Sequence, residues 1–143
     1  MSRTMLYLDS SAIVKTVMAE EESEALRELL RAWPHRVSSA LARVEVPRAL
    51  RRAKAPGFLF ERAQQVLLDI VLISMDEAVL EMAGALEPPA LRALDAIHLA
   101  TALSVKGDLQ AFITYDQRLT DAASQAGLSV WAPGSSRHKP GSG

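Results

Sequence analysis

Four acidic residues stand at the ends of apolar segments, or near the starts of helical patterns, in distant parts of the chain. Asp9 directly follows the run TMLYL, and Asp116 follows AFIT with only Tyr115 between them. Glu45 and Asp95 lie in early turns of predicted helices. Each acid alone has an ordinary explanation, because Asp caps helix starts, acids complement the helix dipole and surface Glu is solvated. Together they could form a site built on carboxylate oxygens.

Carboxylates that share a cleft need a compensating charge. Two of them about 4 Å apart repel by about 4 kcal/mol at an effective dielectric constant of roughly 20, so a cluster takes up protons or binds a cation. The chain has no cysteine and no histidine pair at ligand spacing, which favours Mg²⁺ or Mn²⁺ over zinc. Such an ion can supply an attacking water. The acids therefore predict metal-dependent hydrolysis of phosphodiester bonds.

Short apolar segments alternate with helical patterns along the chain, which predicts the elements that would position these acids. The predicted strands span residues 4–8, 36–38, 71–74, 111–114 and 128–131. The predicted helices span residues 10–18, 20–33, 40–54, 58–69, 76–86, 91–106 and 117–125. This order is typical of an α/β fold with a central parallel sheet of four to five short strands flanked by helices. Ligands of such sheets bind beyond the carboxyl ends of the strands, where all four acids could meet.

The bulk composition fits one soluble domain. The chain has 143 residues, of which 49% are hydrophobic and 23% charged, and a chain of this length can bury a useful core. The absence of cysteine excludes a disulfide scaffold and suits a reducing cytoplasm. We expect no signal peptide and no membrane span, because no apolar run approaches about 20 residues. We assign residues 1–132 to the domain and predict that residues 133–143 form a disordered tail.

The net charge of −1 bears on nucleic-acid binding. Proteins that grip nucleic acid by counterion release are usually basic, so this chain would need a local basic patch or a metal. The densest basic cluster follows Glu45 on the same predicted helix, where it could track an RNA backbone or form a solvated helix face. Lys15 could approach a phosphate, but it is more readily explained by an ion pair with an acidic residue. The candidate RNA contacts are Lys15, Arg48, Arg51, Arg52, Arg92 and Arg118.

Two residues near the acids have less certain roles in the sequence. Pro47 follows Glu45 by two residues, and proline inside a helix costs about 3 kcal/mol. We expect the helix to kink just after Glu45; the alternative is that it starts again with Pro47 in its first turn. His98 lies one turn after Asp95 on the same predicted helix. No carboxylate partner for His98 is evident in the sequence, so we interpret it as a packed or surface histidine.

Four segments together resemble the PIN-domain family, in particular its VapC-type toxin branch. They are LDSSAIVK (Leu8–Lys15), ARVEVPRAL (Ala42–Leu50), LDAIHLATAL (Leu94–Leu103) and ITYDQRL (Ile113–Leu119). The resemblance implies a three-layer PIN-like sandwich and a divalent-metal-dependent endoribonuclease, the toxin of a toxin–antitoxin pair. It also implies a cognate antitoxin as partner and a homodimer. The roles that it implies are catalysis and metal binding for Asp9, Glu45, Asp95 and Asp116, and ordering of the site for Ser11 and Thr114.

Other functions stay open at this stage. A PIN nuclease could act in RNA maturation without being a toxin, and a degenerate PIN module could bind RNA or a partner without cleaving. A fold that transfers phosphate through an aspartyl intermediate would require a second acid close to Asp9, where the sequence has Ser10 and Ser11.

Overall fold

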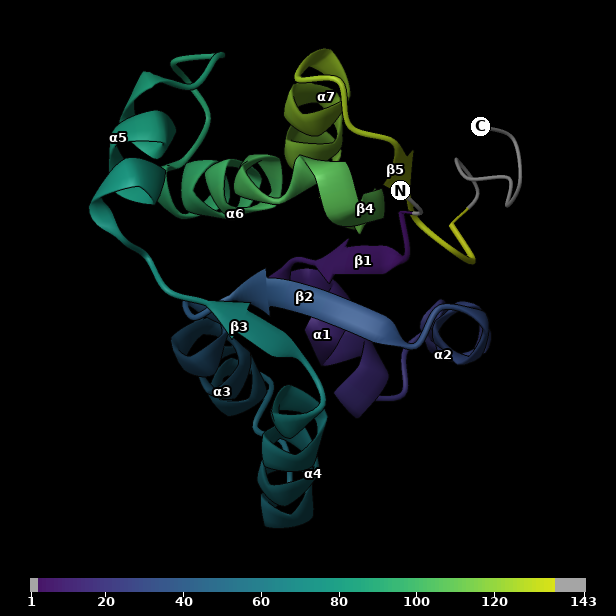
Figure 1. Ribbon diagram of the computed structural model, residues 1–143. Helices are drawn as coiled ribbons and strands as arrows, with labels where there is room; N and C mark the ends of the chain where they lie inside the picture. Colours follow the sequence, from purple (N-terminus) through teal and green to yellow (C-terminus); the bar gives the residue numbers. More distant parts are fainter. Residues whose placement is uncertain (1–2, 136–143) are drawn as a thin grey trace.

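The computed structural model describes residues 3–135 as a five-stranded sheet with helices on both faces (Figure 1). The strands are β1 (Met5–Leu8), β2 (His35–Ser39), β3 (Val71–Ile73), β4 (Leu109–Ile113) and β5 (Val130–Trp131). The helices are α1 (Ser10–Val17), α2 (Ser23–Ala32), α3 (Ala42–Arg52), α4 (Gly57–Leu68), α5 (Glu77–Ala85), α6 (Ala93–Ser104) and α7 (Gln117–Gln125), with a 3₁₀ turn at Lys106–Asp108. Of the predicted tail, residues 133–135 are described, and residues 136–143 lie outside the described part.

All neighbouring strands pair in parallel, in the order β3-β2-β1-β4-β5. The carboxyl ends of the strands therefore share one edge of the sheet. From β1 the chain continues to β2 and β3 on one side, and β4 and β5 lie on the other side. Ligands of open α/β sheets bind at the crevice where the strand order reverses, which here lies between the ends of β1 and β4. The predicted α/β fold class is confirmed.

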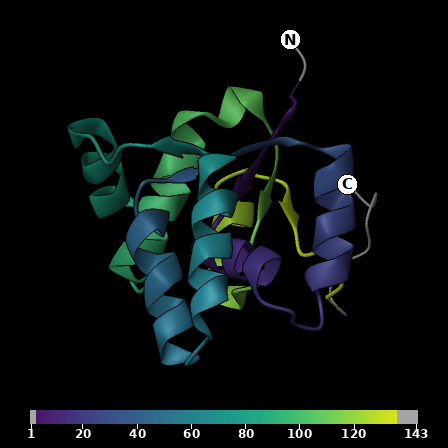
Figure 2. The same cartoon turned by 90° about the horizontal axis from the view of Figure 1, so that it is seen from below.

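The alternation of side chains along β1 and β4 divides the core between two faces, because successive residues of a strand point to opposite sides. Leu6, Leu8 and Ile113 face the layer of α1, α2, α3 and α4. Tyr7 and Phe112 face the layer of α6 and α7, where their rings stack with centroids 5.0 Å apart. Figure 2, turned by 90°, shows α3 and α4 side by side in the first layer. Because both faces of the sheet are covered, the central strand β1 (MLYL) is apolar throughout.

The helix that carries Glu45 is a single element, α3, with Pro47 as its sixth residue. A restart with Pro47 in the first turn of a new helix is therefore wrong. The buried side chains of α3 include Val46 and Leu50, which belong to the core cluster beneath the sheet. This burial offsets the hydrogen bond that proline cannot donate.

Three helices begin with the side chain of an aspartate as N-cap. Asp9, Asp76 and Asp116 accept hydrogen bonds from the backbone N–H groups of the third residues after them. The capping role expected of Asp9 and Asp116 is thus confirmed. It leaves the other carboxylate oxygen of each residue for further contacts. Within residues 3–135, no helix has the length and apolar character that a membrane span requires.

Helix α6 provides a matched pair of leucines that tests the assignment of the core. Leu99 is fully buried and Leu94 is 48% exposed. We expect Leu99→Ala to lower the free energy of unfolding by about 2–5 kcal/mol, through lost burial and a residual cavity. Leu94→Ala should change it by about 0.5 kcal/mol or less. Denaturant titration of both variants measures the difference, and equal losses would contradict the burial described for this helix.

Candidate active site

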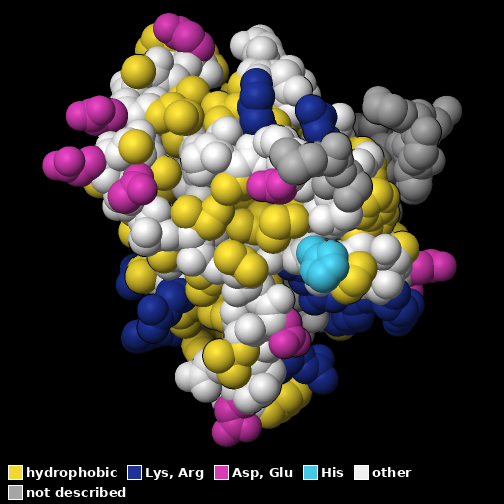
Figure 3. Space-filling model, viewed as in Figure 1, with side chains coloured by type: hydrophobic (Ala, Val, Ile, Leu, Met, Phe, Trp, Pro, Cys, Tyr) yellow, Lys and Arg dark blue, Asp and Glu magenta, His cyan; other side chains and the backbone are white. Residues whose placement is uncertain are grey.

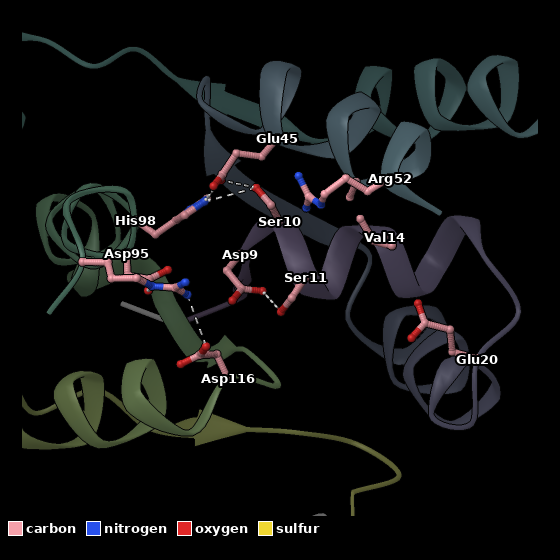
Figure 4. Close-up of a pocket in the computed structure, with 12 residues that line it drawn as sticks. Asp9, Ser10, Ser11, Val14, Glu20, Glu45, Arg52, Asp95, His98 and Asp116 are labelled. Carbon is pink, nitrogen blue, oxygen red and sulfur yellow. Dashed lines mark hydrogen bonds and ion pairs between the residues drawn. The ribbon is translucent and has the colours of Figure 1, made fainter. Parts of the chain in front are cut away.

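A cavity of about 340 Å³ opens at the carboxyl edge of the sheet, and all four predicted acids line it. Figure 4 shows their origins: Asp9 precedes α1, Glu45 lies on α3, Asp95 on α6 and Asp116 before α7. The chain thus brings together carboxylates that are far apart in sequence. Further residues that line the cavity are Ser10, Ser11, Val14, Glu20, Ala49, Arg52, Arg92 and His98.

Asp9 is the most enclosed of the four acids, with only 4% of its surface exposed. Its Oδ1 accepts hydrogen bonds from the Ser11 hydroxyl at 2.7 Å and the Ala12 N–H at 2.9 Å. Its Oδ2 accepts one from the Thr114 hydroxyl at 2.6 Å. Burial raises the pKa of Asp9 in spite of these donors and of the nearby imidazole of His98. The structure thus places Ser11 and Thr114 directly on Asp9.

Asp95 and Asp116 face each other across the side chain of Arg92. The Nε of Arg92 lies 3.1 Å from Asp95 Oδ2, and its Nη2 lies 3.6 Å from Asp116 Oδ2. The second contact is drawn as a dashed line in Figure 4. The Arg92 side chain is 68% exposed, so these pairs contribute little to stability. Their importance is electrostatic, because a guanidinium stands between two acids that would otherwise repel.

Glu45 is held by groups on two other helices. Its Oε1 accepts hydrogen bonds from the Ser10 hydroxyl at 2.6 Å and from His98 Nε2 at 2.7 Å. Partial burial alone would raise the pKa of Glu45, but the contacts with His98 and Ser10 outweigh it and hold the pKa below its usual value. Glu45 is therefore ionised at neutral pH.

His98 is a packed histidine, one of the two interpretations given above, and it has a carboxylate partner that the sequence did not reveal. His98 is 2% exposed, and its two ring nitrogens contact Tyr7 and Glu45. Its position one turn after Asp95 was a signal that it faces the same side of α6. The partner could not be read from the sequence, because Glu45 is 53 residues away and comes near His98 only in the folded chain.

Carboxylate and hydroxyl oxygens dominate this cavity, and both His98 nitrogens already have protein partners. By donor type the residues suit a hard cation. Across residues 3–135, however, no three His, Asp or Glu side chains converge as a complete metal-ligand group. The acids share one cavity, and protein donors and Arg92 satisfy them there.

The residues predicted to contact RNA lie in different parts of the structure. Arg52 lines the cavity and adds positive charge near Glu45. Arg48 and Arg51 are exposed on α3, and Figure 3 shows Lys and Arg side chains gathered over that helix at lower left. Lys15 pairs with Glu22 at 2.7 Å and with Glu20 at 3.0 Å, as the alternative explanation expected. Arg118 lines another cavity, next to Pro88 and Asp121.

Comparison with known proteins identifies the family. The model of the PIN domain matches residues 6–125. The chain is 49% identical over 132 residues to Ribonuclease VapC46 of Mycobacterium tuberculosis, a match that covers 90% of this chain and 97% of that protein. The solved structure of VapC20 from Mycobacterium tuberculosis, a sarcin–ricin loop cleaving toxin, aligns with a TM-score of 0.68 at 16% identity, covering 86% of this chain and 95% of that one. A chain of a toxin–antitoxin complex from Klebsiella pneumoniae aligns with a TM-score of 0.62 at 22% identity. The alignment covers 79% of this chain and 88% of that one. The two structures support the fold, and the family model and VapC46 show that the chain belongs to the PIN-domain family, in its VapC branch.

Proposed function

We propose that the chain is a divalent-metal-dependent endoribonuclease that acts as the toxin of a toxin–antitoxin pair. The observation that carries the proposal is the meeting of Asp9, Glu45, Asp95 and Asp116 in one cavity at the sheet edge. The relative VapC46, which is named a ribonuclease, supports RNA as the substrate.

In this proposal the four acids are the catalytic and metal-binding residues, and Ser11 and Thr114 orient Asp9. Mg²⁺ or Mn²⁺ would supply positive charge at the scissile phosphate and lower the pKa of an attacking water. Hydrolysis adds that water to phosphorus and breaks one P–O ester bond, and the departing oxygen takes up a proton. Asp95 and Asp116 would exchange Arg92 for the cation. Arg92, freed in this way, would be able to contact a phosphate.

The RNA backbone would approach along α3. Arg52 at the cavity, with Arg48 and Arg51 on the same helix, forms a local basic patch on a chain of net charge −1. Such a patch could release counterions from RNA although the chain as a whole is not basic. Lys15 is a weaker candidate, because Glu20 and Glu22 already neutralise it.

We also propose a cognate antitoxin and a second copy of the chain as partners. The fold of the chain aligns with a protein solved in a toxin–antitoxin complex. Apolar side chains exposed on α4 and β3, namely Phe58, Leu68 and Val71, provide surface that a partner would cover. Co-purification with the product of a neighbouring small gene tests the antitoxin proposal.

The substitution Asp95→Asn tests the catalytic assignment. It removes one carboxylate charge from the cavity while preserving size, so we expect cleavage of total RNA in Mg²⁺ or Mn²⁺ to fall by about 100-fold or more, with the fold unchanged by circular dichroism. Asp121→Asn makes the same charge change at an exposed position on α7 and should cleave like the parent. Cleavage by Asp95→Asn at the parental rate, or parental cleavage that persists in EDTA, would refute the assignment.

Thermal melting tests cation binding, and its pH dependence follows from Asp9. Because burial raises the pKa of Asp9 above 3.8, ionisation of Asp9 destabilises the metal-free chain. The stability that the protonated Asp9 carboxyl provides is therefore present below the unfolded-state pKa. It is lost as pH rises through the folded-state pKa. A cation requires the ionised form, so the Mn²⁺-induced rise in melting temperature should grow as pH rises from about 3.8.

The size of that rise follows from mass action. Mn²⁺ at 100 times its Kd should stabilise the chain by about 2.7 kcal/mol, and EDTA should abolish the effect. Asp121→Asn should behave like the parent, whereas Asp95→Asn should respond more weakly. A metal response that is absent, or that is equal at all pH values, would count against a cation bound by Asp9.

A further inference from the structure

A buried line of hydrogen-bonding groups runs from the core to the cavity. The Tyr7 hydroxyl lies 2.7 Å from His98 Nδ1, and His98 Nε2 lies 2.7 Å from Glu45 Oε1. Tyr7 is fully buried and His98 is 2% exposed. Figure 4 shows the end of this line, where His98 and Ser10 both point to Glu45. Both side chains are therefore shielded from bulk water.

The proton positions along this line follow from what each group can donate. An ionised carboxylate only accepts, so the contact at 2.7 Å requires a proton on His98 Nε2. Burial raises the pKa of Tyr7 well above its usual value, so the phenol retains its proton. The hydroxyls near Tyr7 are already committed as donors, because Ser38 donates to the Leu8 carbonyl and Thr101 to the Ile97 carbonyl. With the His98 proton on Nε2, Nδ1 can only accept, and the Tyr7 hydroxyl 2.7 Å away is the donor that faces it.

The two donors on Glu45 act on the same oxygen. Ser10 and His98 both contact Oε1, and in the described part of the chain Oε2 accepts no hydrogen bond. A carboxylate fixed through one oxygen has a fixed orientation, and the other oxygen remains available to a ligand. Since Glu45 lines the cavity, that free oxygen is the one that could meet a ligand there.

We propose that Tyr7 and His98 are positioning residues for Glu45. The Nε2–H group of His98 donates to Oε1 of Glu45, the Tyr7 hydroxyl donates to the opposite ring nitrogen, and Oε2 of Glu45 is left for the ligand in the cavity. The tautomer depends only on the geometry described above. The role of Glu45 Oε2 in binding a cation for RNA cleavage rests on the proposed function.

The first test reads the tautomer directly and requires no activity. In ¹⁵N-histidine-labelled protein, long-range ¹H–¹⁵N correlation spectra distinguish protonated from unprotonated ring nitrogens, and the His98 signal is the one that His98→Gln removes. We expect Nε2 protonated and Nδ1 unprotonated in the parent, and in Tyr7→Phe an Nδ1 resonance that is shifted by the loss of its hydrogen-bond donor. A parent ring protonated at Nδ1, or a Tyr7→Phe spectrum identical to the parent's, would overturn the proposal.

The second test measures what the clamp does. Loss of a hydrogen-bond partner behind a metal ligand typically weakens metal affinity or activity by about 10–100-fold. We expect Tyr7→Phe to lower kcat and Mn²⁺ affinity by about 10-fold, with KM for RNA unchanged. His98→Gln keeps an N–H donor for Glu45 and should retain more of both than His98→Leu does. Equal losses of kcat and Mn²⁺ affinity in the two His98 variants would contradict the proposal that the His98 N–H group positions Glu45.

A matched control separates positioning from general destabilisation. Phe112 stacks on the Tyr7 ring, so Phe112→Leu disturbs the same packing and leaves the hydroxyl in place. It should lower the melting temperature without changing the tautomer, kcat or Mn²⁺ affinity. If Phe112→Leu reproduces the effects of Tyr7→Phe, the hydroxyl has no positioning role. If the parent neither binds Mn²⁺ nor cleaves RNA, the proposed function fails, and the spectra alone decide the tautomer.

Discussion

Negative charge gathered at one edge of a parallel sheet is the constraint on which the rest of this structure depends. Carboxylates that share a cavity repel strongly where water is partly excluded, and the chain compensates each of them differently. Asp9 receives hydroxyl and backbone donors, Glu45 receives a serine and an imidazole, and Asp95 and Asp116 share Arg92. Asp9 is buried, the other three acids are half-buried, and the counter-charge Arg92 is exposed. Arg92 is therefore the counter-charge that a ligand could most readily replace.

The fold creates this edge with little specialised structure. Parallel strands place their carboxyl ends together, and helices that start there require capping groups. Asp9 and Asp116 satisfy that requirement with one oxygen each. The same residues thus begin a helix and present charge to the cavity. Structural and chemical roles coincide in them, so the ordinary and the functional explanations of these acids do not compete.

Much of this arrangement could be predicted from the sequence because it depends on local pattern. The apolar runs around Tyr7 and Phe112 predicted buried strands, and the acids that follow those runs predicted a shared edge. Element boundaries were less predictable: α2 begins at Ser23, whose hydroxyl accepts from the Glu20 N–H and donates to the Met18 carbonyl. Such contacts depend on where the chain turns, and the periodicity of hydrophobic residues does not reveal that.

The contacts that could not be predicted are long-range ones between side chains. His98 reaches Glu45 and Tyr7 across elements separated by 53 and 91 residues, and Pro47 remains inside α3 because the buried face of the helix holds it. Arg92 lies close to Asp95 in the sequence, and only its second contact, with Asp116, was hidden in the same way.

Anomalous diffraction from a crystal grown with Mn²⁺ tests most directly the claim that these carboxylates form a cation site. We expect a peak in the anomalous difference map within the cavity, with oxygens of Asp9, Asp95 or Asp116 about 2.1 Å from it. Arg92 should then have moved away from Asp95 and Asp116. An empty cavity at saturating Mn²⁺, with Arg92 still between Asp95 and Asp116, would contradict it.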